Sequence, residues 1–214
     1  MPVEVVSYML SSLDPKKCLQ FQIVLWCAPF LKGMKTACAV NIEEQYCPEL
    51  EGILADTDIE YRYLSRDKGK RLVFFYRKKE FSGYLGRTDV RRFLERFGYA
   101  QREPEEVLDR LSERVCRYIR RGAGFPHEIG VFLDYPIDDV RCFMEQKGKG
   151  GVMTGYWKVY HNPGKAQLIF QAYDKARISA VNEFLAGGTI REIACKRVLQ
   201  EFSRGDEGGS YELR

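Results

Sequence analysis

The chain has 214 residues, of which 45% are hydrophobic and 30% are charged, and its formal net charge is +4. This balance is that of an ordinary globular protein and leaves little room for extended disorder. The longest apolar stretch near the start, residues 21–31, is far shorter than the roughly 20 residues of a membrane-spanning helix, so we expect no membrane association.

The N-terminal part of the chain is predicted to form two helices, a strand and an acidic helix or loop. In chain order these are residues 1–13, 15–28, 36–42 and 43–58. The second helix has Asp14 as its N-cap and Pro15 at its first helical position, which are the residue types preferred there. Pro29 and Gly33 are expected to stop this helix, because neither residue type continues a helix well.

The middle of the chain is predicted to form a β-hairpin followed by two helices. Residues 61–65 and 71–77 are rich in aromatic side chains and flank a polar, glycine-containing stretch at residues 67–70, which is typical of a hairpin. Residues 88–98 carry apolar side chains at the 3.6-residue period of a helix and end in glycine. Residues 104–121 form the clearest predicted helix, since an acidic first turn and a basic last turn both complement the helix dipole.

The C-terminal third begins with a predicted strand at residues 128–135, where every second residue is apolar and falls on one side. The next elements are a helix from Pro136, a glycine-rich loop at residues 148–155, a strand at residues 156–160 and a long helix capped by Asn162-Pro163 that runs to about Leu185. Thr189-Ile190-Arg191-Glu192 is a capping box, which predicts a last helix.

These elements predict an α+β fold. Strands and helices are mixed without strict alternation, so we expect a small three- to four-stranded sheet, mostly antiparallel or mixed, packed with about seven helices. The expected organisation is a single α+β domain at residues 1–202, followed by a flexible tail at residues 203–214 that is rich in glycine and charge.

The cysteines favour a cytoplasmic protein without a metal site. There are seven, at positions 18, 27, 38, 47, 116, 142 and 195, and no two are spaced as Cys-x-x-Cys. An odd number with this spacing is typical of free thiols in a reducing compartment. A structural zinc site needs four convergent ligands, and the chain offers only two histidines to help. Residues 1–13 also contain no Lys or Arg, unlike a secretory signal.

Three segments together resemble a bacterial family, domain of unknown function 3793. They are Cys-Ala-Pro-Phe-Leu-Lys-Gly-Met-Lys at residues 27–35, Phe-Pro-His-Glu-Ile-Gly-Val-Phe-Leu-Asp-Tyr-Pro-Ile-Asp-Asp-Val at residues 125–140 and Gly-Tyr-Trp-Lys-Val-Tyr at residues 155–160. The resemblance extends over about residues 20–190. It gives little information about activity, and it assigns neither a cofactor nor a catalytic residue. It suggests one hypothesis, that of an accessory protein in iron or flavodoxin-linked metabolism.

His127 and Glu128 are the best catalytic candidates, because they lie between a glycine turn and a predicted strand start. Histidine moves protons near neutral pH, and Glu128 is able to orient it or act beside it. Adjacent strand residues point to opposite faces, however, so the two side chains need not share a site. The structural alternative is that His127 bonds a backbone carbonyl and Glu128 pairs with a nearby arginine. Whether the protein is an enzyme therefore stays open.

Lys35, Arg121 and Lys158 are the ligand-binding candidates. Lys35 and Lys158 each lie beside glycine or aromatic residues in one of the three segments, and with Arg121 they would suit a phosphate or a carboxylate. The alternative is that they are solvated surface cations. Our leading hypothesis is a protein that binds a small anionic ligand where Lys35, His127 and Lys158 meet.

Residues 61–102 provide a second hypothesis, an interaction module. They contain 13 Lys and Arg against four Asp and Glu, together with ten aromatic residues. Cations interleaved with stacking rings are what a single-stranded nucleic acid requires, and the same charge suits an acidic protein partner. Most of these rings also fit core positions, which is the alternative interpretation.

Overall fold

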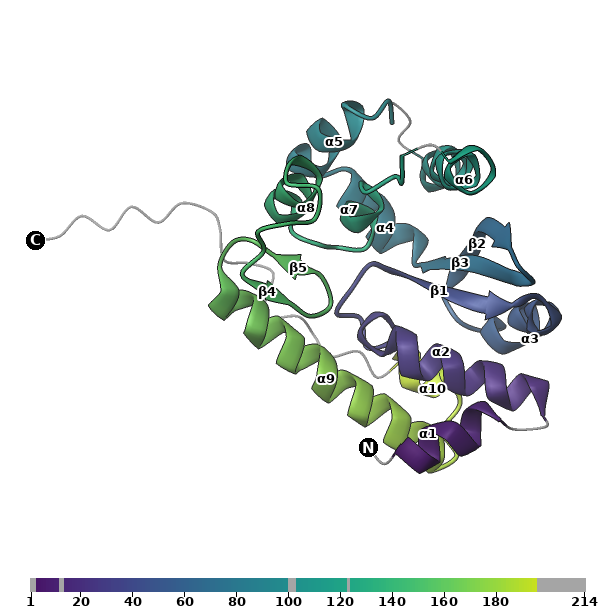
Figure 1. Ribbon diagram of the computed structural model, residues 1–214. Coiled ribbons are helices and arrows are strands. Elements are labelled where there is room, and N and C mark those ends of the chain that lie inside the picture. Colours follow the sequence, from purple (N-terminus) through teal and green to yellow (C-terminus); the bar gives the residue numbers. More distant parts are fainter. Residues whose placement is uncertain (1–2, 12–13, 100–102, 123, 196–214) are drawn as a thin grey trace, which may run out of the picture.

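The computed structural model describes residues 3–11, 14–99, 103–122 and 124–195, and within them it is an α+β fold (Figure 1). The helices are α1 (Val3–Leu10), α2 (Pro15–Leu31), the 3-10 helix η1 (Glu44–Glu49), α3 (Leu50–Leu54), α4 (Lys78–Leu85), α5 (Thr88–Glu95), α6 (Pro104–Arg121), α7 (Ile129–Phe132), α8 (Ile137–Glu145), α9 (Pro163–Leu185) and α10 (Ile190–Cys195). The strands are β1 (Ala37–Glu43), β2 (Glu60–Asp67), β3 (Lys70–Tyr76), β4 (Met153–Thr154) and β5 (Lys158–Val159). The predicted fold class is confirmed, although the described residues hold more helices than the seven expected. The predicted flexible tail at residues 203–214 lies outside the described residues.

A three-stranded antiparallel sheet in the order β1-β3-β2 forms the centre of the fold. The predicted hairpin is β2 and β3. Its turn contains Lys68 (φ 47°) and Gly69 (φ 74°), and this pair of positive φ angles is the geometry that matches the twist of two antiparallel strands. The register of β2 against β3 shifts between Tyr63 and Ser65, so Leu64 occupies a bulge.

The sheet is covered by helices on both faces, as Figure 1 shows. Alternate residues of β1 and β3 enter two different cores, because side chains of a strand alternate between its faces. Cys38, Val40 and Phe75 pack against α2, α9 and α10. Phe74 and Tyr76 pack on the other face, against residues of α4 to α8. The sheet therefore separates two helical layers.

Local capping chemistry explains where several helices begin. The carboxylate of Asp14 accepts hydrogen bonds from the amides of Lys16 and Lys17, at 3.0 and 3.2 Å, so the predicted N-cap of α2 is confirmed. The predicted capping box of α10 is confirmed as well. The amide of Thr189 donates to the Glu192 carboxylate at 2.8 Å, and the amide of Glu192 donates to the Thr189 hydroxyl at 3.2 Å.

Two predicted boundaries are wrong. Helix α2 continues through Pro29 to Leu31 instead of stopping at the proline, and the chain turns at Gly33, where φ is 75°. A proline removes one donor and strains the preceding turn, but the buried apolar residues on both sides of Pro29 keep the helix packed. The strand predicted at residues 156–160 shortens to β5, which pairs with β4 in a separate hairpin and not with the central sheet.

The strand predicted at residues 128–135 is wrong. Residues 129–132 form the single helical turn α7, in which the amide of Leu133 donates to the carbonyl of Ile129 at 3.1 Å. Gly130, Val131 and Phe132 are all buried, so alternation of apolar side chains carries no information about a solvent face here. Asp134 then adopts a φ of 58°, which ends the segment in a sharp turn and returns the chain toward α8.

Candidate functional site

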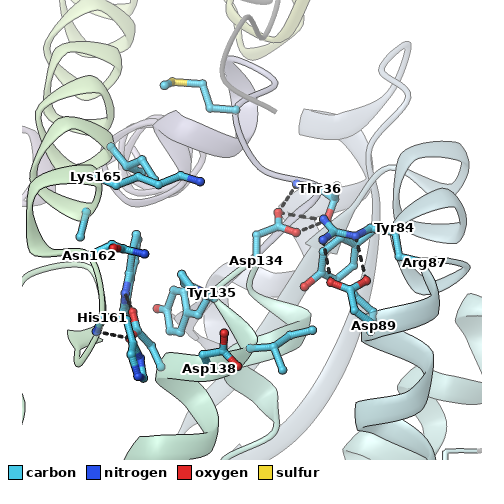
Figure 2. A pocket seen from close by; sticks show the side chains of 18 of the residues that line it. Thr36, Tyr84, Arg87, Asp89, Asp134, Tyr135, Asp138, His161, Asn162 and Lys165 are labelled. Atoms are coloured by element: carbon cyan, nitrogen blue, oxygen red, sulfur yellow. Dashed lines mark hydrogen bonds and ion pairs between the residues drawn. The ribbon is translucent and has the colours of Figure 1, made fainter. Parts of the chain in front are cut away.

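A groove with a volume of about 730 Å³ lies beside this turn. Four parts of the chain line it: the segment before β1, residues 80–90 of α4 and α5, residues 134–139, and residues 157–173, which include the start of α9. Figure 2 shows polar side chains from all but the first of these parts turned toward one hollow, with Thr36 behind them. The groove is therefore built by segments that are far apart in the sequence.

Asp134 joins two walls of the groove. Its carboxylate accepts hydrogen bonds from the Thr36 amide at 2.5 Å and from the Thr36 hydroxyl at 3.0 Å, which ties the turn after α7 to the start of β1 (Figure 2). Partial burial raises the pKa of Asp134 above its usual range, although Lys35 and the two hydrogen bonds from Thr36 oppose this shift. The pKa of Lys35 is lowered, mainly because burial removes its ammonium from water.

The raised pKa of Asp134 predicts a stability that falls as the pH rises. Between the ordinary aspartate pKa of about 3.9 and the raised value, the folded state binds more protons than the unfolded state, so the slope of unfolding free energy against pH is negative. Asp134→Asn should remove this contribution, which is about 1.4 kcal/mol for each unit of pKa shift. Urea unfolding of both proteins from pH 4 to pH 7 measures it. Asp56→Asn is the matched control, because Asp56 also has a positive φ of 61° but is exposed. A wild-type advantage over Asp134→Asn that grows with pH would contradict the assignment.

Asp139 fixes the wall that the groove shares with the start of α9. The carboxylate is buried, and it accepts hydrogen bonds from the indole of Trp157 at 2.8 Å and from the amides of Tyr160 and His161, each at 2.9 Å. The Nδ1 atom of His161 lies 3.2 Å from the same carboxylate. One side chain of α8 thus holds β5, the imidazole and the beginning of α9 in place.

Five carboxylates line the groove, those of Glu80, Asp89, Asp134, Asp138 and Asp139, and the last four are engaged by the following protein groups. Two of them are Asp134 and Asp139, as described. Asp89 pairs with Arg87 at 2.8 Å, and Asp138 pairs with Arg141 at 3.2 Å. The ammonium of Lys165, in contrast, has no such partner. No described residue forms an ion pair or hydrogen bond with it, and it points into the hollow in Figure 2. The groove therefore presents one cation that is not already neutralised by a described carboxylate.

Two of the sequence-predicted residues share a smaller pocket. His127 and Lys158 line a pocket of about 170 Å³, which is mostly apolar. Tyr135, Asp139 and Trp157 line this pocket and the groove, so they form a common wall. The pocket and the groove are thus neighbours on two sides of one set of side chains.

The other predicted residues lie apart from this pocket or beside it. Glu128 is buried and lines neither the pocket nor the groove. It accepts a hydrogen bond from the Tyr99 hydroxyl at 3.0 Å and pairs with Arg114, which is the structural alternative anticipated for it. Lys35 places its ammonium 5.3 Å from the ring centre of Tyr135. Arg121 is exposed at the end of α6 and lines neither hollow. The catalytic pairing of His127 with Glu128 gains no support from this arrangement.

Sequence reasoning missed the residues that shape the groove. Asp134, Asp138 and Asp139 stand in the central segment of the family resemblance, and His161 is the second of the two histidines. Their clustering in that segment was the available signal. Lys165 carries no local signal, because it is one of many lysines and its role depends on where α9 begins.

Part of the positive charge of the basic segment at residues 61–102 is neutralised within the fold. Acids from elsewhere in the chain neutralise several of its cations: Arg71 pairs with Glu44, Lys78 with Glu105 and Arg77 with Asp58. The ten aromatic residues of the segment are buried or half-buried. They are therefore core residues, and within the described part of the chain they offer no exposed stacking platform.

Comparison with known proteins gives one match. The model of the family described as "Protein of unknown function (DUF3793)" matches residues 23–194. No curated protein and no solved structure matches the chain. Among the residues that the structure describes, no helix is long and apolar enough to cross a membrane, and no three His, Cys, Asp or Glu side chains gather as a metal site would require. The match covers most of the chain and confirms the resemblance, so the chain belongs to the DUF3793 family.

Proposed function

We propose that the protein binds a small ligand with a phosphate or carboxylate group in the groove, with the anionic group at Lys165 and His161. The observation that carries this proposal is the ammonium of Lys165, which faces the hollow and pairs with no carboxylate of the described residues. A volume of about 730 Å³ is within the range of pockets that hold small ligands and cofactors.

The first turn of α9 adds to the attraction for an anion. The first intrahelical hydrogen bond runs from the Ala166 amide to the Asn162 carbonyl, at 3.0 Å, so the amides of Gly164 and Lys165 precede it. Asn162 has a left-handed backbone, and its side chain does not cap the helix. The positive end of a 23-residue helix therefore lies beside Lys165 without a side-chain cap. Free amides and an ammonium at one helix end suit a phosphate or carboxylate oxygen.

The rings of the groove lining suit an apolar or aromatic portion of the ligand. Tyr135, Trp157 and Tyr173 contribute rings to its lining. The ring of Tyr135 packs 5.7 Å from that of Trp157, and the Trp157 indole is held by Asp139, so this wall is preorganised. A molecule that carries both a ring and an anionic group matches these two features of the groove.

Phenyl phosphate tests the proposal, with benzyl alcohol as the neutral comparison. We expect saturable binding of phenyl phosphate by isothermal titration calorimetry and at least tenfold weaker binding to Lys165→Met, because a charge-assisted hydrogen bond is worth roughly 1.5–3 kcal/mol. Lys175→Met is the matched control, since Lys175 is an exposed lysine of the same helix outside the groove lining. Equal affinities of the two variants, or no binding of phenyl phosphate to the wild type, would overturn the proposal.

A further inference from the structure

The smaller pocket has the form of a site for a single ring. Its apolar lining is contributed by Phe125, Ile129, Val140 and Phe143, with the rings of Tyr135 and Trp157 on the common wall. Its volume of about 170 Å³ is close to that of an apolar cavity of roughly 150 Å³ that holds benzene in another protein. The pocket is therefore large enough for one ring and too small for a nucleotide.

Gly130 keeps the pocket wall closely packed. A β-carbon at this position would lie 2.9 Å from Cγ2 of Val140, which is closer than real β-carbons approach other atoms, and 3.1 Å from Cδ2 of Tyr135, which is closer than most such contacts. The glycine therefore lets α7 approach α8 and the common wall as closely as it does. Tight packing of this kind fixes the wall before any ligand arrives.

His127 is a polar residue of this mostly apolar lining, together with Lys158 and the buried Asp139, whose carboxylate is already engaged by Trp157, Tyr160 and His161. Its imidazole lies between two rings, with ring centroids 5.2 Å from Phe125 and 5.1 Å from Phe143. No hydrogen bond or ion pair joins its ring nitrogens to another described residue. The imidazole is thus positioned by tilted contacts with these two rings, and its nitrogens are available to a ligand in the pocket.

Lys158 provides a full positive charge to the lining. Its ammonium donates one hydrogen bond to the carbonyl of Gly148, and its aliphatic chain packs so closely on Gly151 that a β-carbon there would lie 2.6 Å from Cε. Within the described ranges no carboxylate pairs with this ammonium. An ammonium has three donors, so two remain for a ligand. A cation held at the edge of an apolar pocket selects an apolar group that carries a negative charge.

We propose that this pocket binds an aromatic monocarboxylate, with the ring inside the apolar lining and the carboxylate on Lys158 and His127. The site is separate from the anion position in the groove, because Lys165 and His161 lie on the other side of the common wall and do not line the pocket. The inference stands whether or not the groove binds an anion.

Trp157 reports on the pocket directly. The chain has two tryptophans, and Trp26 is 56% exposed and lines neither hollow, so Trp26→Phe leaves Trp157 as the single fluorescent tryptophan. In this background, phenylacetate is expected to change the fluorescence saturably. Phenylacetamide, its neutral isostere, should bind at least tenfold more weakly, because it leaves the ammonium without a counter-charge.

Three lysine variants separate this site from the groove. Lys158→Met should weaken phenylacetate at least tenfold and leave phenylacetamide within about twofold, since only the charge is removed. Lys149→Met, an exposed lysine near the pocket but outside its lining, and Lys165→Met should leave phenylacetate unchanged. Thermal unfolding verifies that each variant is folded. The proposal is overturned if phenylacetate gives no saturable signal, if phenylacetamide binds equally well, or if Lys165→Met weakens phenylacetate while Lys158→Met does not.

Discussion

Replacing Arg77 by methionine is expected to lower the free energy of unfolding by about 3 kcal/mol, because it removes charged hydrogen bonds from a site closed to water. Arg77 follows β3, and its side chain is 2% exposed. It donates to the carbonyls of Phe30 at 2.7 Å and Leu31 at 3.2 Å, which are the last residues of α2, and it pairs with Asp58 at 3.0 Å. The guanidinium therefore satisfies the end of a helix that water cannot reach.

The measurement is urea unfolding of three variants. Arg77→Lys should recover part of the loss, since an ammonium keeps the charge but cannot span both carbonyls and the carboxylate as a planar guanidinium does. Arg62→Met is the matched control, because Arg62 also pairs with an aspartate, Asp109, but is 44% exposed, and exposed pairs contribute roughly 0–1 kcal/mol. Equal losses for Arg77→Met and Arg62→Met would show that the helix end does not depend on Arg77.

Elements that depend on local chemistry could be predicted from the sequence. The start of α2 follows from Asp14 and Pro15, and the hairpin turn follows from the glycine at residue 69. Helix α6 ends at Gly122, which has a left-handed φ of 63° that glycine adopts readily. Its amide donates to the Tyr118 carbonyl. In each case the deciding interactions lie within one turn of the chain, so a short window of sequence contains them.

Elements that depend on tertiary packing could not be predicted in this way. Residues 128–135 have the alternation of a strand, but they pair with no strand of the described sheets, and the burial of residues 130–132 makes their period ambiguous. Glu128 was a catalytic candidate because of its neighbour in sequence. Its actual partners, Tyr99 and Arg114, come from other segments and bury it. The assignment of its role required knowing where α6 packs.

The same limit applies to the two hollows. Glycine-flanked cations could be recognised in the sequence, and His127 and Lys158 do line one pocket together. That they share this pocket with the rings of Tyr135 and Trp157 could not be predicted, since it depends on how α8 packs beside β5. Lys165 could not be distinguished from other lysines until the start of α9 was placed beside the turn at Asp134. Side chains on fixed elements are positioned by distant contacts, which composition and spacing do not record.

Asp139→Asn is expected to lower the free energy of unfolding by about 2–3 kcal/mol, the second large effect, since it leaves a buried donor without an acceptor. The two carboxylate oxygens accept different hydrogen bonds. Oδ2 accepts from the Trp157 indole, and Oδ1 accepts from the amides of Tyr160 and His161. An asparagine side chain has only one oxygen that accepts hydrogen bonds. Its NH2 group would therefore face either the Trp157 indole or the two backbone amides, which are donors as well. Asp138→Asn is the neighbouring control. Asp138 is 69% exposed, so this variant should change stability by less than about 0.5 kcal/mol.

Near-ultraviolet circular dichroism and urea unfolding check this expectation together, because the lost hydrogen bond belongs to Trp157. The signal of the indole should weaken in Asp139→Asn and persist in Asp138→Asn. Since Asp139 holds the wall common to the groove and the pocket, its replacement should weaken phenyl phosphate and phenylacetate alike, whereas Lys165→Met and Lys158→Met should each affect one probe. If Asp139→Asn retains the stability and the indole signal of Asp138→Asn, the buried carboxylate does not organise this wall, and the preorganisation invoked for both ligands is lost with it.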